Sequence, residues 1–74
     1  MVPFLTDTQR IEYRHLHKKS KEKQIADRMK SILWLDAGVG FDEVAKLLMI
    51  DEVTPRRWYQ QYEEGGIEKL LNFA

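Results

Sequence analysis

The chain has 74 residues, 12 basic and 12 acidic side chains, and no cysteine. A chain this short buries only about 60% of the surface that its unfolded form exposes, which leaves room for one modest core and none for an enclosed substrate cleft. The lack of thiols excludes disulfides and zinc fingers. The apolar runs are too short for a membrane span, and the amino terminus lacks the basic-then-apolar layout of a signal peptide. We therefore expect residues 1–74 to form one folded, cytoplasmic domain.

Charge is divided unevenly along the chain. Residues 1–37 hold eight Lys and Arg against five Asp and Glu, whereas residues 38–74 hold four against seven. Basic side chains neutralise phosphates and release counterions, so a net charge of zero predicts weak, salt-sensitive binding if the partner is a nucleic acid.

The first predicted helix spans residues 7–17. Thr6 and Gln9 have the spacing of a capping box, in which each side chain bonds to the other residue's backbone N–H. Asp7 adds negative charge at the positive end of the helix dipole.

The second helix is predicted to be the longest and to serve as the scaffold. Its start is expected after Ser20, a favoured capping residue, and its end at Asp36 or Ala37, before a left-handed Gly38. Apolar residues recur along it at helical spacing, which predicts one broad buried face. These residues are Ile25, Met29, Ile32 and Leu33.

A short third helix is predicted over residues 41–48, and a fourth ends at the glycine pair 65–66. Residues 67–71 then read as one or two further helical turns, so the expected fold is an all-α bundle of four to five helices.

The start of the fourth helix has two candidate caps, Asp51 and Thr54. Thr54 is preferred, because Pro55 then takes the first helical position, where no backbone N–H is required. This choice moves Val53 off the helix.

Residues 41–64 have the layout of a helix-turn-helix: a short helix with the small Ala45 in its middle, a brief connection and a second helix. At about 100° per residue, Pro55, Trp58 and Tyr62 fall within about 60° of one another and define an inner face. Trp34, in the predicted second helix, is also expected to be a core residue. The opposite face carries Val53, Arg56, Arg57, Gln60 and Glu64.

That outer face suits base reading in the major groove of double-stranded DNA. Arg can form a bidentate contact with guanine or bind a phosphate, Gln can hydrogen-bond to adenine, and Val can contact a thymine methyl group. A cluster of lysines between the first two helices can assist at phosphates. The predicted DNA-binding residues are Val53, Thr54, Arg56, Arg57, Gln60, Lys18, Lys19 and Lys21.

The sequence also resembles the amino-terminal, homeodomain-like helix-turn-helix region of mariner-like bacterial insertion-sequence transposases. The matching pieces are Leu5-Thr6-Asp7, the helix end at Ala37-Gly38, residues 41–48, Arg56-Arg57-Trp58 with Tyr62, and residues 64–71. The resemblance implies sequence-directed DNA binding, with a magnesium-dependent catalytic domain elsewhere in the full protein. The chain stops at Asn72-Phe73-Ala74, which fits an excised domain or a remnant.

Three positions depart from that family. Met49 stands where the turn usually has Gly, so a left-handed backbone there would be strained, or the turn has another shape. Glu52 takes a place that is often basic or small, which puts negative charge near the expected phosphates. Pro55 replaces an inward Val.

Other chemistry finds little support in the sequence. His15 and His17 point to different sides of a helix, which argues against a metal site. The carboxylates lack an acid–base partner, so we expect no enzyme activity, no cofactor and no small-molecule substrate.

The alternative function is a protein-interaction or dimerisation module, in which the acidic half and Tyr59 and Tyr62 face another protein; a homodimer is left open. A positive patch around Arg56 and Arg57 favours DNA, and an exposed apolar patch favours the alternative.

Overall fold

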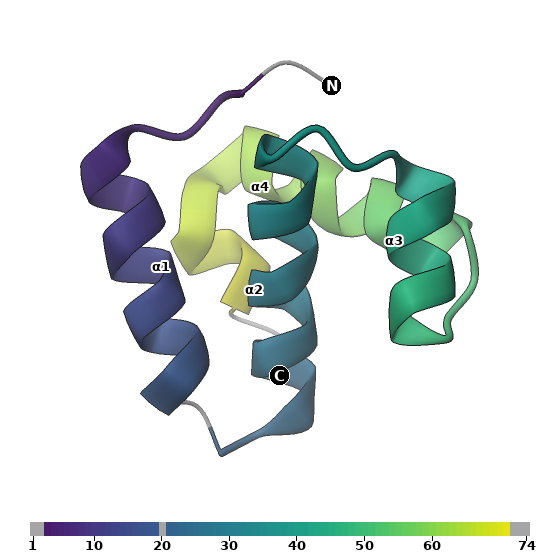
Figure 1. The fold of residues 1–74 in the computed structure, drawn as a ribbon, viewed down its shortest axis with the longest axis horizontal. Coiled ribbons are helices and arrows are strands. Elements are labelled where there is room, and N and C mark those ends of the chain that lie inside the picture. Colours follow the sequence, from purple (N-terminus) through teal and green to yellow (C-terminus); the bar gives the residue numbers. More distant parts are fainter. Residues whose placement is uncertain (1–2, 20, 72–74) are drawn as a thin grey trace.

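The computed structural model describes residues 3–19 and 21–71, and within these ranges it contains helices and no strand (Figure 1). The helices are α1 (Asp7–Lys19), α2 (Lys23–Asp36), α3 (Phe41–Leu48) and α4 (Val53–Leu71). The predicted small all-α helix-turn-helix bundle is confirmed.

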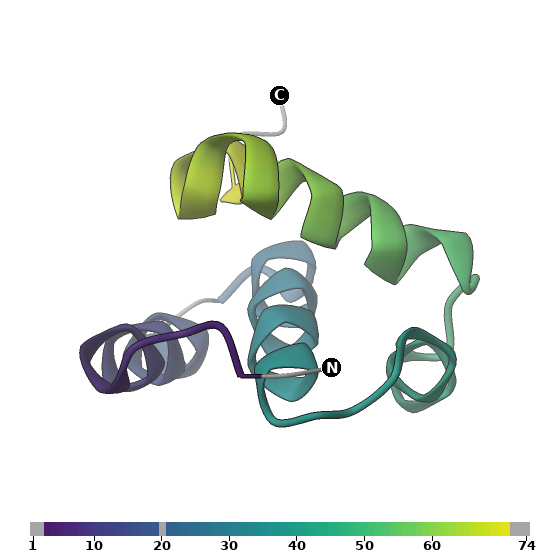
Figure 2. The same cartoon turned by 90° about the horizontal axis from the view of Figure 1, so that it is seen from above.

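Helix α2 lies at the centre of the bundle, with α1 on one side and α3 on the other (Figure 1). Seen from above, α4 crosses one face of the layer that these three helices form (Figure 2). The α2 backbone contacts all three other helices, which confirms its predicted role as the scaffold. It is also the longest uninterrupted helix, as predicted, with 14 residues, because the non-helical backbone of Gly66 divides the 19 residues of α4.

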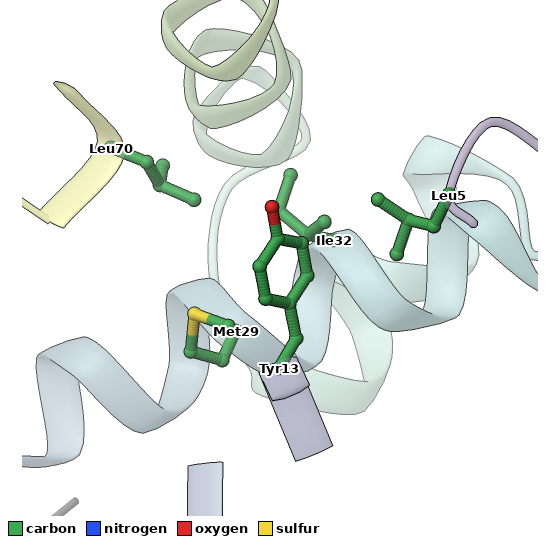
Figure 3. Close-up of a cluster of buried hydrophobic side chains, with 5 residues drawn as sticks. All are labelled: Leu5, Tyr13, Met29, Ile32 and Leu70. Carbon is green, nitrogen blue, oxygen red and sulfur yellow. The ribbon is translucent and has the colours of Figure 1, made fainter. Parts of the chain in front are cut away.

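The core gathers between α1, α2 and the last turn of α4. Its buried side chains come from four parts of the chain (Figure 3): Leu5, Tyr13, Met29, Ile32 and Leu70. Half-buried apolar side chains surround this cluster, including Ile25, Leu33, Trp58 and Tyr62. The stripe predicted along the second helix is therefore part of the core.

The predicted capping box at α1 is confirmed. The Gln9 N–H donates to Thr6 Oγ1 at 3.1 Å, and the Thr6 N–H donates to Gln9 Oε1 at 2.9 Å. The helix runs two residues beyond its predicted end, to Lys19. Its last turn carries His17, Lys18 and Lys19, whose positive character suits the negative end of the helix dipole.

The two ends of α2 differ in how well they were predicted. The helix begins at Lys23, so the capping position falls on Glu22, whereas the expected cap Ser20 lies outside the described residues. At the other end Gly38 has φ 96°, and its N–H donates to the Leu35 carbonyl while the Val39 N–H donates to that of Trp34. This pair of bonds forms a Schellman motif, which confirms the left-handed glycine cap.

A second glycine bends α4. Gly66 has φ 70° and ψ −161°, a backbone conformation that is essentially restricted to glycine. Beyond it the chain turns back, and Leu70 is fully buried in the core. The predicted helix end at the glycine pair and the further turns over residues 67–71 both correspond to this bend.

Asp36 joins the amino-terminal segment to α1 and α2. Its side chain is buried, and Oδ1 accepts hydrogen bonds from the backbone N–H groups of Phe4 and Leu5, each at 2.8 Å. Oδ2 lies 2.5 Å from Nε of Arg10 on α1. The hydrogen bond from Arg10 holds the pKa of Asp36 below its ordinary value; burial opposes this shift, and the two backbone donors reinforce it.

We predict that Gly66→Ala lowers the free energy of unfolding by about 1 to 3 kcal/mol, because an L residue is strained at this φ and ψ. An added Cβ would meet nothing within 4 Å, so the cost comes from the backbone alone. Urea unfolding measures the change. A synthetic chain with D-alanine at position 66 is the control, since the mirror-image conformation is extended and relaxed. Equal destabilisation by the two enantiomers would rule out backbone strain as the cause.

We predict that Asp36 makes the fold sensitive to acid. Its folded-state pKa lies below the unfolded value of about 3.9, so its contribution is complete above that pH and is lost as the pH falls through the folded pKa. Urea unfolding between pH 2 and pH 6 should show this loss, and Asp36→Asn should flatten the curve in the same range. A carboxyl-carbon NMR titration of the unmodified chain checks the site directly. A midpoint at or above about 3.9 would contradict the prediction.

Candidate nucleic-acid interface

Helices α3 and α4 have the arrangement of a helix-turn-helix. Figure 2 looks along α3 and shows α4 lying across it, which is the steep crossing that the motif requires. Val44 and Ala45 on the inner side of α3 are buried, with Ala45 3% exposed. The small residue predicted in the middle of this helix therefore lies on its packed side.

The turn between the two helices is a second Schellman motif. The Met49 N–H donates to the Lys46 carbonyl at 3.2 Å, and the Ile50 N–H donates to the Ala45 carbonyl at 2.9 Å. Met49 itself has φ 59° and ψ 46°, in the left-handed region. Of the two alternatives that the sequence left open, the structure has the strained left-handed turn.

The second helix of the motif starts earlier than predicted. It begins at Val53, and the Thr54 N–H donates to the Asp51 carbonyl at 3.2 Å, so the preferred Thr54 cap is wrong. Pro55 permits this early start because the first N–H groups of a helix have no intrahelical partner. Val53 consequently lies on the helix, with 60% of its surface exposed.

The inner face of α4 agrees with the prediction. Pro55 is fully buried, and Trp58 and Tyr62 pack against the core cluster. The Tyr62 hydroxyl lies 3.0 Å from that of Tyr13, and burial raises the pKa of Tyr62 well above its ordinary value. Tyr59 is also half-buried. Both tyrosines therefore pack partly within the bundle, which argues against the expectation that they face a partner protein.

The outer face at the start of α4 presents two arginines in different settings. Arg56 is exposed, and its guanidinium carbon lies 4.8 Å from the ring centre of Phe41 on α3. Arg57 is exposed and forms no ion pair with any described residue. One turn further, Gln60 donates to Glu64 Oε1 at 3.4 Å, a weak surface contact that a ligand could replace.

The charge around this face is mixed. Residues 41–64 carry three basic and six acidic side chains, and all nine are exposed. Glu52 is among them, in the turn directly before α4. Arg56 and Arg57 therefore form a small positive site and not a wide positive patch.

Exposed apolar side chains lie close to the arginines in sequence. They are Leu47, Met49 and Val53, which are 53%, 92% and 60% exposed. Such side chains are the feature expected of an interaction module, and they occur on the same motif as the arginines.

The predicted lysines lie elsewhere. Lys18 and Lys19 are exposed at the end of α1, and Lys21 is exposed in the connection to α2. Because α1 and α3 lie on opposite sides of α2, the structure does not bring these lysines beside Arg56 and Arg57 (Figure 1).

One important cation was missed in the sequence analysis. Arg28 on α2 donates to the Leu70 carbonyl at 2.9 Å, and its guanidinium lies 5.3 Å from the ring centre of Trp58. It thereby secures the inner face of α4 and its last turn. The available signal was its register, because Arg28 falls three residues after Ile25 in the buried stripe.

No helix within the described ranges is long and apolar enough to cross a membrane. In the same part of the chain, His, Asp and Glu side chains do not gather in threes as a metal ion requires.

A family described as helix-turn-helix domain matches residues 27–72. The chain belongs to this helix-turn-helix family. The match covers most of α2, all of α3 and all of α4, and leaves α1 outside. Comparison with curated proteins and with solved structures gives no significant match. Helix-turn-helix domains typically bind DNA, so the family supports DNA binding.

We predict that Met49→Gly raises the free energy of unfolding by about 1 kcal/mol, because glycine accepts the left-handed conformation without strain. The Met49 side chain is 92% exposed, so little packing is lost. Met49→Ala is the matched control, since it removes the same exposed side chain and keeps the strain. Urea unfolding compares the three chains, and equal stability of the two variants would refute the strain.

Proposed function

We propose that this chain binds double-stranded DNA through the helix-turn-helix of residues 41–64, with the start of α4 in the major groove. The observation that carries the proposal is the two-sided start of α4: Pro55 is fully buried, whereas Arg56 and Arg57 are exposed beside it. A helix that reads DNA needs such a fixed inner side and an open outer side.

The proposed DNA-contacting residues of the motif share the first two turns of α4. Because the helix begins at Val53, the apolar Val53 side chain sits on the outer face with the arginines, where it can meet a thymine methyl group. The proposed set is Val53, Thr54, Arg56, Arg57 and Gln60. Lys18, Lys19 and Lys21 are proposed to reach phosphates away from the groove in which α4 lies.

The wider context is also proposed. The resemblance to mariner-like transposases supports the role of a DNA-recognition domain of such a protein, or of a remnant of one. In this role residues 1–74 act as a single domain without catalysis, and any catalytic domain is separate.

A second candidate function is homodimerisation or binding of another protein. It is favoured by the exposed apolar side chains of Leu47, Met49 and Val53 around the turn. The arginines favour DNA, since an apolar protein interface does not explain two adjacent exposed guanidinium groups.

We predict that the domain binds labelled random duplex DNA at low salt and loses affinity as salt rises. Arg56→Ala/Arg57→Ala should weaken binding by at least about tenfold and reduce the steepness of the salt dependence. Fluorescence anisotropy at two salt concentrations measures both effects.

The charge-matched control is Lys18→Ala/Lys19→Ala, which also removes two exposed positive charges. Its effect should be clearly smaller. Equal losses in both double variants would mean that general charge, and not the helix-turn-helix, governs binding. Absence of binding at low salt, together with a dimer in analytical ultracentrifugation, would favour the second candidate.

A further inference from the structure

A row of aromatic rings connects the amino-terminal segment to Arg56. The Phe4 ring meets Tyr59 edge-on at 5.3 Å between centroids, and Tyr59 meets Phe41 in the same manner at 5.9 Å. The guanidinium of Arg56 lies over the far end of this row, 4.8 Å from the Phe41 ring centre. The Phe41 ring thus lies between Tyr59, which packs against the core, and the guanidinium of Arg56 along this row of contacts.

This contact changes what Arg56 can do. An exposed arginine normally loses considerable rotamer entropy when it binds a ligand. A cation–π contact with an aromatic ring restricts the side chain in advance, and because the ring is no conventional hydrogen-bond acceptor, the N–H groups of the guanidinium stay available. Within the described part of the chain, Arg56 forms no ion pair that would occupy them.

The direction of this restriction matters. Phe41 is the first residue of α3, so the contact draws Arg56 toward the other helix of the motif. In helix-turn-helix complexes that first helix crosses the DNA backbone, while the start of the second helix meets base edges. Arg57 lies about 100° further round α4 and has no such tether.

We propose that Phe41 is a positioning residue that holds Arg56 for a DNA phosphate, and that Arg57 is the arginine that reads bases. This inference rests on the proposed DNA-binding function and assigns different DNA contacts to the two adjacent arginines. Phe41 itself touches no DNA in this arrangement.

The test is a double-mutant cycle with Phe41→Leu and Arg56→Ala, measured by fluorescence anisotropy on the duplex that the wild type binds best. Phe41→Leu should weaken binding by about two- to fivefold, the range expected for a surface cation–π contact. The same substitution should have little further effect in the Arg56→Ala chain, because there the ring has nothing to hold. Full additivity of the two effects would overturn the proposal.

Phe41→Tyr is the conservative control, since it keeps the ring and should restore near-normal affinity. Thermal unfolding of each variant separates positioning from a loss of fold, and a merely structural role would make affinity follow stability in all variants. If Phe41→Leu does not fold, Phe41→Tyr against Phe41→Met provides the same comparison.

A panel of duplexes with single base changes tests the division between the arginines. Arg56→Ala should weaken binding to all duplexes alike and lower the salt slope by about one, whereas Arg57→Ala should change the base preference. A changed preference in Arg56→Ala would overturn the assignment. If the wild type binds DNA and Arg56→Ala/Arg57→Ala does not, the proposed DNA binding is supported even where the separate roles of the two arginines are refuted. If the wild type does not bind DNA, both proposals are refuted.

Discussion

The buried carboxylate of Asp36 is the contact on which the arrangement of the bundle depends. It stands at the last residue of α2, where the helix dipole disfavours a negative charge, and it is removed from water. Such a group is tolerated only when strong donors surround it, and here they come from Arg10 on α1 and from the backbone of Phe4 and Leu5. One side chain therefore fixes the amino-terminal segment and α1 relative to α2.

That segment in turn supports α4. With its backbone bonded to Asp36, Phe4 places its ring against Tyr59 and Tyr62 on the inner side of α4. The far end of α4 is held independently, because the bend at Gly66 returns the chain to the core and Arg28 binds the Leu70 carbonyl. Helix α4 is thus restrained from inside along its length, which leaves its outer face free for a partner.

The sequence predicts best what depends on near neighbours. The capping box of Thr6 and Gln9, the bounds of α3 and the two faces of α4 follow from spacings of a few residues, and all agree with the structure. The cap at Thr54 was wrong because a first-turn proline is compatible with more than one helix start. The partners of Asp36 and Arg28 could not be predicted, since they lie 26 to 42 residues away. The contact of Arg56 with Phe41 was also not predicted, because the two residues lie on different helices and nothing local sets the register between them.

The acidic residues of the motif bear on the proposed positioning of Arg56. Asp42 and Glu43 occupy the first turn of α3, a helix of only eight residues that would be marginal without favourable charge at its positive end. The same charges repel phosphate, so stabilising α3 weakens any general attraction to DNA. A domain with a broad basic surface can bind with loosely held side chains, whereas this motif has few cations to offer. If the motif binds DNA as proposed, each cation must lose little entropy on binding, and a guanidinium already held over an aromatic ring meets that requirement.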